Sequence, residues 1–171
     1  MDIVINPGSG FGTGEHLSTQ AVLTMMSRIE MPQKVLDVGC GSGILSIAAV
    51  RLGASRVVAC DIDPLAVSNA KENLKLNGVK GIYLILGTPS CIGERFPLVM
   101  ANIDFFTLTT LREELARLTE DGGTLLLSGI LREDEETVVQ LYRQVGFTLK
   151  KAINIGDWSG LHLERSGIKG S

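Results

Sequence analysis

Residues 35–43, VLDVGCGSG, contain the strongest structural signal in the chain. Residues 34–38 form an apolar run typical of a buried parallel strand, and a helix is predicted to begin near Ile44. Between them, Gly39, Gly41 and Gly43 leave no side chain to keep a ligand away from the backbone. Free N–H groups at the helix start point at the same space, so we expect a nucleotide or nucleoside pocket there.

The spacing of the glycines distinguishes between kinds of pocket. A dinucleotide fingerprint is G-x-G-x-x-G, whereas here the third glycine comes one residue early. Asp37 also places a carboxylate inside the predicted pocket, where it would repel the two phosphates of a dinucleotide. A zwitterionic cofactor with a cationic sulfonium and an amino group would suit that carboxylate better. The simpler alternative is that residues 39–43 only form a tight strand-to-helix turn.

Composition limits the class of protein. A chain of 171 residues is long enough for one domain with a substantial core and too short for two ordinary ones. Its net charge of −3, without a basic run, argues against a nucleic-acid partner bound through phosphates. We find neither a positively charged start nor 18 consecutive uncharged apolar residues, so we expect a soluble cytoplasmic protein without a membrane span. The cysteines and histidines show no metal-ligand spacing, and we expect no metal site.

Residues 1–15 are predicted to form a glycine-rich arm or lid. Residues 3–14 combine Pro7 with four glycines, and such a segment does not hold its own structure without a partner. Phe11, its one large aromatic residue, is expected either to press on a ligand or to pin the arm to the core. An amphipathic helix is predicted to follow, from beyond His16 to about Arg28.

Strands and helices alternate through most of the remaining sequence. The expected strands span residues 34–38, 56–61, 81–86, 97–102 and 123–129. The expected helices span residues 44–52, 64–77 and 108–118, with a last helix starting in the acidic turn 133–136. Residues 147–164 are predicted to form two strands joined near 156–157, without a helix between them. The pattern predicts an α/β fold, a doubly wound Rossmann-like sheet of seven strands, mainly parallel with a C-terminal antiparallel hairpin and helices on both faces. We assign this domain to residues 16–165, with a tail at 166–171.

Polar side chains lie at the predicted carboxyl ends of three of these strands. Asp61 comes 22 residues after Gly39, close to the offset at which a carboxylate accepts hydrogen bonds from ribose hydroxyls. Asp63 directly precedes a proline and is expected to cap the next helix. Asp37 ends the first strand and Asn102 the fourth. Ligands of such sheets bind at the carboxyl edge, so we expect Asp37, Asp61 and Asn102 at one site.

The sequence resembles the catalytic domain of class I S-adenosylmethionine-dependent methyltransferases, and more narrowly the ribosomal protein L11 methyltransferase group. The general features are DVGCGSG at residues 37–43 and the strand-end Asp61. More specific is FGTGEHLST at residues 11–19, which is similar to the F-G-T-G-x-H-x-T-T segment of the group, with Ser18 replacing the first threonine of the pair. Further matching segments are ANI at 101–103, SGIL at 128–131 and GDW at 156–158. These segments are distributed along the chain, and the resemblance spans nearly all of it.

The resemblance implies S-adenosylmethionine as the cofactor and the amine of a ribosomal-protein-like substrate as the methyl acceptor. The residues then expected to contact the cofactor are Phe11, Thr13, Asp37, Gly39, Cys40, Gly41, Gly43, Asp61, Ile62, Thr88 and Asn102. Methyl transfer is an in-line displacement in which the enzyme chiefly positions the reactants. Asn102, through its side-chain oxygen, and Ile103, through its backbone carbonyl, are expected to accept hydrogen bonds from the amine. Alternatively, Asn102 only caps the end of its strand.

Other functions fit part of the sequence. One is a cofactor-binding module without catalysis, and another is a small-molecule methyltransferase. A Rossmann oxidoreductase is disfavoured by the glycine spacing and by Asp37. The resembled group carries an additional N-terminal domain that recognises the ribosomal protein, so we expect either a stand-alone relative or a catalytic-domain fragment. Asp104 stands where the group has an apolar or aromatic residue, and we expect it to cap the following helix, with substrate binding as the less favoured interpretation.

Overall fold

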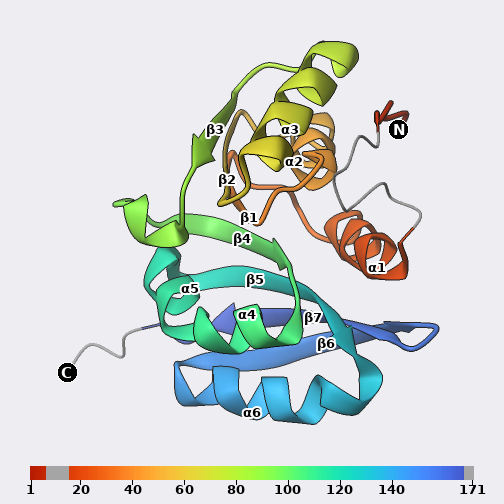
Figure 1. The fold of residues 1–171 in the computed structure, drawn as a ribbon. Helices are drawn as coiled ribbons and strands as arrows, with labels where there is room; N and C mark the ends of the chain where they lie inside the picture. The colour runs from red at the N-terminus through yellow and green to blue at the C-terminus, as the bar shows by residue number, and fades with distance from the viewer. Residues whose placement is uncertain (7–15, 168–171) are drawn as a thin grey trace.

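The computed structural model describes residues 1–6 and 16–167, which form a single mixed sheet with helices on both faces (Figure 1). The strands are β1 (Lys34–Val38), β2 (Arg56–Asp61), β3 (Ile82–Leu86), β4 (Phe96–Asn102), β5 (Thr119–Leu131), β6 (Phe147–Ile155) and β7 (Trp158–Arg165). The helices are α1 (Leu17–Met26), α2 (Ile44–Arg51), α3 (Pro64–Asn77), α4 (Phe105–Thr110), α5 (Arg112–Leu118) and α6 (Glu135–Gln144). Two 3₁₀ turns complete the described elements, Pro89–Cys91 and Arg132–Asp134.

The order of the strands in the described part of the chain is β3-β2-β1-β4-β5-β7-β6. Strands β1 to β5 pair in parallel, whereas β7 lies antiparallel between β5 and β6. This confirms the predicted seven-stranded sheet with its antiparallel C-terminal hairpin. The chain runs outward in opposite directions from β1 and β4, and a crevice therefore opens at the carboxyl ends of these two strands.

Alternate residues of the central strands face opposite sides of the sheet and build two cores. Val35 of β1 faces the side that α1 and α2 cover, and Leu36 faces the other side. On that other side α4, α5 and α6 contribute the buried side chains of Leu108, Leu115 and Tyr142. Because both faces are covered, the parallel strands are continuous apolar runs, which is the feature that made them predictable.

The single helix predicted over residues 108–118 is wrong, because the structure divides it into α4 and α5. The break falls at Leu111, whose backbone has φ −88° and ψ 3°. One turn earlier, the carbonyl of Leu108 accepts a hydrogen bond of 2.6 Å from the buried hydroxyl of Tyr142. A buried tyrosine hydroxyl needs such a partner, and α6 supplies it at the end of α4. The leucine spacing continues through the break, so periodicity alone does not reveal it.

Two other boundaries differ from the expected ones. Strand β5 is longer than the predicted 123–129, and its register with β4 shifts between Phe96 and Leu98. This register shift accommodates Gly122 within β5, although its φ of 75° is more typical of a turn. The acidic stretch starts with the 3₁₀ turn Arg132–Asp134, and α6 begins only at Glu135.

Residues 3–6 dock on the domain that is predicted for residues 16–165. Ile3 and Ile5 pack against the core formed by α1 and α2. The backbones of Val4 and Asn6 bond to α3. Residues 7–15, which include the predicted contacts Phe11 and Thr13, lie outside the described residues. No helix among the described residues is long and apolar enough to cross a bilayer.

Candidate functional site

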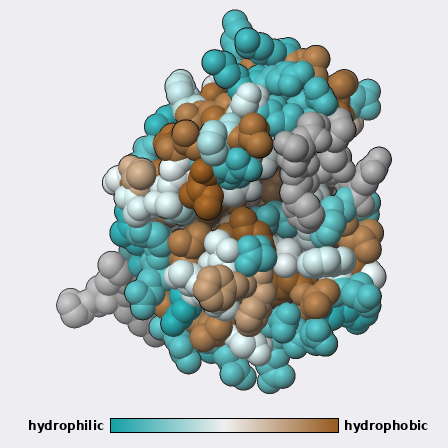
Figure 2. Space-filling model, in the orientation of Figure 1, coloured by the Kyte–Doolittle hydropathy of each residue, from teal (hydrophilic) through white to brown (hydrophobic). Residues whose placement is uncertain are grey.

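A cavity of about 540 Å³ lies at the carboxyl edge of the sheet, beside the ends of β1, β2 and β4. The start of α1, the turn after β1, and the first residues of α3 and α4 contribute to its described lining. In the orientation of Figure 1, hydrophobic side chains gather around a hollow near the middle of the visible face (Figure 2). The volume is typical of sites for small organic ligands.

The turn at residues 39–43, the glycine turn, contributes part of the lining of this cavity. Gly39, Gly41 and Gly43 have φ values of 70°, 51° and 84°, which other residues rarely adopt. Gly39 and Gly41 line the cavity. Gly43 has a different role from the predicted ligand contact, because a Cβ atom there would lie 3.3 Å from the Cβ atom of Ala70. This glycine allows α2 to begin against α3.

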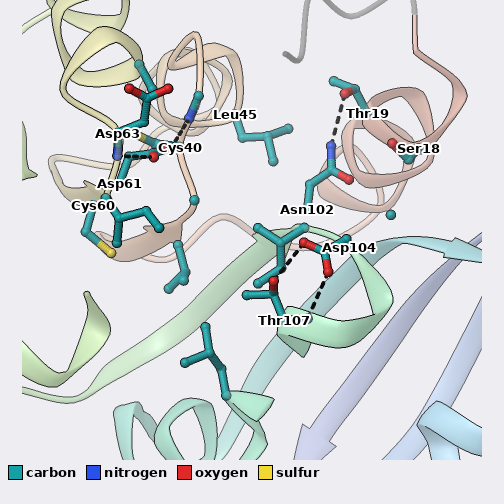
Figure 3. A pocket seen from close by; sticks show the side chains of 18 of the residues that line it. Ser18, Thr19, Cys40, Leu45, Cys60, Asp61, Asp63, Asn102, Asp104 and Thr107 are labelled. Carbon is teal, nitrogen blue, oxygen red and sulfur yellow. Dashed lines mark hydrogen bonds between the residues drawn. The ribbon is translucent and has the colours of Figure 1, made fainter. Parts of the chain in front are cut away.

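Asp61 is held rigidly at the cavity wall. Its Oδ2 atom accepts the N–H of Gly41 at 3.0 Å, and its Oδ1 atom accepts the N–H of Asp63 at 3.0 Å (Figure 3). A carboxylate oxygen can accept more than one hydrogen bond, so both oxygens can still receive ligand hydroxyls. Asp63 caps α3 by accepting the N–H of Leu65 at 2.9 Å, as predicted.

The carboxylate of Asp37 lies behind the turn, and our prediction that it projects into the pocket is wrong. Asp37 is 1% exposed and is not among the described residues that line the cavity. Its Oδ2 atom accepts a hydrogen bond of 2.6 Å from Ser46, while its Oδ1 atom has no partner in the described part of the chain. Burial raises the pKa of Asp37 to about 6, against the opposing effect of the Ser46 bond and with a further rise from the charge of Asp61.

Of the remaining residues predicted to contact the cofactor, some line the cavity and one does not. Cys40 and Ile62 line the cavity, and Ile62 exposes 71% of its surface beside it. Thr88 does not belong to the described lining, although its neighbours Gly87 and Pro89 do. The hydroxyl of Thr88 pairs with that of Ser90 instead. Burial raises the pKa of the Cys40 thiol far above its usual value, so this side chain is a neutral, apolar part of the wall.

Asn102 reaches the cavity from the end of β4, and α1 holds its amide in place. The Nδ2 atom donates a hydrogen bond of 3.0 Å to the hydroxyl of Thr19 (Figure 3). The Oδ1 atom is buried and finds no partner among residues 1–6 and 16–167. An unpaired buried acceptor is costly, so this oxygen is suited to receive a donor from a ligand. Thr19 was missed as a site residue because its partner is 83 residues away in the sequence.

Ile103 is wedged between two glycines. A Cβ atom on Gly39 would collide with the Cγ2 atom of Ile103, and one on Gly129 would collide with its carbonyl oxygen. Gly129 also has φ 94° and lines the cavity with Ile103. Gly129 is therefore a second missed site residue, and its sequence signals are its position at the end of a strand and its place in the SGIL segment at 128–131.

The cavity rim contains further residues that the sequence did not assign to the site. His16 caps α1 by accepting the N–H of Ser18 at 3.2 Å, and its ring lies 4.7 Å from that of Trp158 in an edge-to-face contact. Asp104 lines the cavity and caps α4, as predicted, through a 2.9 Å bond from the N–H of Thr107. A second bond, from the Thr107 hydroxyl at 2.7 Å, is the main reason that the pKa of Asp104 is lowered.

The sheet and its helices form the Rossmann-like fold that solved methyltransferase structures share. One solved structure of this fold is magnesium protoporphyrin IX methyltransferase from Synechocystis with bound S-adenosylmethionine. It aligns with a TM-score of 0.70 at 19% identity, over 86% of this chain and 77% of that chain. A ribosomal protein L11 methylase from Lactobacillus delbrueckii aligns with a TM-score of 0.90 at 34% identity, over 96% of this chain and 85% of that chain.

The chain belongs to the ribosomal protein L11 methyltransferase family, as the sequence resemblance predicted. The sequence model of that family, "Ribosomal protein L11 methyltransferase (PrmA)", matches residues 1–166. A curated relative from Geobacter sulfurreducens is 44% identical over 165 residues, which are 96% of this chain and 55% of the relative. One from Bacillus cytotoxicus is 36% identical over 159 residues, covering 91% and 51% respectively. The chain thus spans about half the length of the curated relatives that it matches.

Proposed function

We propose that this protein uses S-adenosylmethionine to N-methylate an amine on a protein of the ribosomal protein L11 type. The observation that carries the proposal is the unpartnered Oδ1 atom of Asn102 in the described structure, beside a cavity that the glycine turn partly lines. This function belongs to the domain at residues 16–165, with residues 3–6 docked on it. A ribosomal-protein substrate would be met in the cytoplasm.

The residues of the cavity fit the cofactor on three counts. The doubly anchored carboxylate of Asp61 can accept the two ribose hydroxyls. The backbone at Gly39 and Gly41 is free of side chains, which allows polar groups of the ligand to approach it. Ile62 offers an exposed apolar surface on which a base can stack. When bound, S-adenosylmethionine would supply an electrophilic methyl group to the substrate amine.

Two acceptors can hold the substrate amine. The Oδ1 atom of Asn102 accepts one N–H, and the carbonyl of Ile103, beside Gly129, accepts another. A neutral amine held by both N–H groups directs its lone pair away from them, and this alignment is the main requirement of an in-line displacement. The bond from Asn102 to Thr19 keeps the amide nitrogen turned away from the amine.

Asp104 contributes charge at the rim and is a poor general base. Its hydrogen bonds to Thr107 lower its pKa and therefore keep it ionised. A carboxylate at this place favours approach of a cationic amine, and the amine then loses its proton to water before it reaches Asn102. This route requires no strong base in the site.

A methyl-transfer assay tests the proposal. The purified protein is mixed with a bacterial ribosomal protein L11 and labelled S-adenosylmethionine, and the modified residue is located by mass spectrometry. We expect label on an amine nitrogen of L11. Binding of S-adenosylhomocysteine without transfer to L11 would support a non-catalytic module, and absence of binding would overturn the proposal.

A further inference from the structure

Helix α3 presents a stripe of three residues, Ala70, Asn73 and Asn77, to the glycine turn and the N-terminal segment. Their spacing of three and four residues places them on one face of the helix. Ala70 contacts Gly43 at the start of α2. Asn73 is completely buried, which is unusual for an asparagine unless its amide is fully used.

The two asparagines hold the N-terminal segment as a neighbouring strand would. Asn77 accepts the N–H of Val4 at 2.9 Å and donates to its carbonyl at 2.7 Å. Asn73 accepts the N–H of Asn6 at 2.8 Å and donates to its carbonyl at 3.2 Å. Four helical residues rise about 6 Å and two extended residues about 6.6 Å, so amides one turn apart match alternate residues of the segment.

Asn73 makes one more bond, and this bond reaches the glycine turn. Its Nδ2 atom also donates to the carbonyl of Ser42 at 2.9 Å. The amide nitrogen has two hydrogens, so it serves Asn6 and Ser42 together. Ser42 follows Gly41, which lines the cavity and bonds to Asp61. One buried side chain therefore joins the N-terminal segment to the turn.

We propose that Asn73 is a positioning residue that couples the docking of residues 3–6 to ligand binding at the glycine turn. The inference rests on the proposed function, because the ligand is S-adenosylmethionine or its product. When the segment is docked, the amide of Asn73 is fully bonded and fixes the Ser42 carbonyl. Without the segment, the amide of Asn73 loses both hydrogen bonds to the backbone of Asn6, and it then holds the Ser42 carbonyl less firmly. Coupling of this kind is reciprocal, so ligand at the turn also holds the segment in place.

Calorimetry with S-adenosylhomocysteine measures the coupling in four variants. Asn73→Ser should weaken binding about five- to twenty-fold, because it releases the Ser42 carbonyl and the segment together. Asn6→Pro removes the backbone donor to Asn73 together with the side-chain bond to Glu72, and should cause a smaller loss of affinity. Asn6→Ala keeps that donor and loses only the side-chain bond to Glu72. Asn77→Ala removes the bonds to Val4 and to the backbone carbonyl of Asn73, and leaves the side chain of Asn73 bonded to Asn6 and Ser42. Each should stay within about threefold of wild type.

Two further results separate coupling from a general structural role. Asn6→Pro should add almost nothing in the Asn73→Ser background, since the bond is already lost. Amide exchange at Val4 and Asn6 should slow when S-adenosylhomocysteine is added to wild type, and should not respond in Asn73→Ser. Unchanged affinity in a folded Asn73→Ser variant would overturn the inference, and if that variant does not fold, unchanged affinity in Asn6→Pro would do so. A wild-type protein that binds no S-adenosylhomocysteine would overturn the proposed function itself.

Discussion

Substitution of the single residue Asp61 tests the predicted ribose contact of the cofactor. Asp61→Ala should weaken S-adenosylhomocysteine binding by about 1.5–3 kcal/mol, roughly ten-fold to slightly more than a hundred-fold, because two charge-assisted acceptors are lost. Calorimetry on the folded variant measures this. Asp63→Ala is the control, since loss of the α3 cap should cost about 1 kcal/mol of stability and leave the affinity nearly unchanged. Equal affinity of Asp61→Ala and wild type would contradict the assignment.

Asp37 should make stability depend on pH. Its pKa is about 6 in the folded protein, against 3.8 for an exposed group, so the folded state prefers the neutral form. The unfolded chain releases the proton first, and stability therefore falls as pH rises from about 4 to above 6, by about 3 kcal/mol in total. In Asp37→Asn, the amide oxygen can still accept the hydrogen bond from Ser46, but the side chain no longer ionises.

Urea unfolding at pH 4.5 and pH 7.5 measures the effect of Asp37. The variant should gain stability relative to wild type as the pH increases. A difference between the two proteins that is the same at both pH values would contradict the predicted titration of this carboxyl group.

The site residues that could be predicted from the sequence are those that stand at the end of a predicted strand. Asp61 and Asn102 follow apolar strands, and the carboxyl ends of parallel strands meet at one edge. Thr19 and Gly129 act through contacts with Asn102 and Ile103, which lie on other elements. Thr19 and Gly129 both lie in segments that resemble the family, but those segments do not show which side chains they contact. The orientation of Asp37 was missed for the same reason, since its partner Ser46 lies on α2.

At the scale of elements, the bond between α6 and α4 should contribute to stability. Tyr142→Phe leaves the Leu108 carbonyl without its buried donor, which should cost about 1–3 kcal/mol in the free energy of unfolding. Urea unfolding measures the loss. Tyr83→Phe is the matched control, because Tyr83 is 58% exposed and its hydroxyl can be solvated. Similar effects of the two substitutions would contradict a special role for the Tyr142 bond.

The leucine spacing is compatible with one continuous helix over residues 108–118 and does not reveal the break between α4 and α5. Leu108 and Leu115 keep the same face across Leu111, so the apolar pattern is unchanged. The break is associated with a hydroxyl from α6, 34 residues away. A single-sequence argument has no access to such a partner.

At the scale of the molecule, the fold class followed from the alternation of strands and helices and from the absence of a helix signal between the last two strands. The position of β7 between β5 and β6 was not predicted, because pairing with β5 is set by contacts distant in sequence. Two cores separated by one sheet leave the carboxyl edge as the place where polar groups converge. The proposed methyl-transfer site therefore depends on the whole sheet.

The central claim is that Asn102 positions the substrate amine. Asn102→Ala should keep S-adenosylhomocysteine affinity within about threefold and lower the methyl-transfer rate by about 10² to 10³, as expected for loss of one preorganised bond. Asp104→Ala is the paired control, because loss of the α4 cap should cost about 1 kcal/mol of stability. Asp104 acts only on the approach of the amine, so at saturating ribosomal protein L11 the rate per folded molecule should be unchanged. The decisive measurement is the single-turnover transfer rate of both variants with ribosomal protein L11. A slow Asn102→Ala and a normal Asp104→Ala are predicted, and the reverse result would contradict the account.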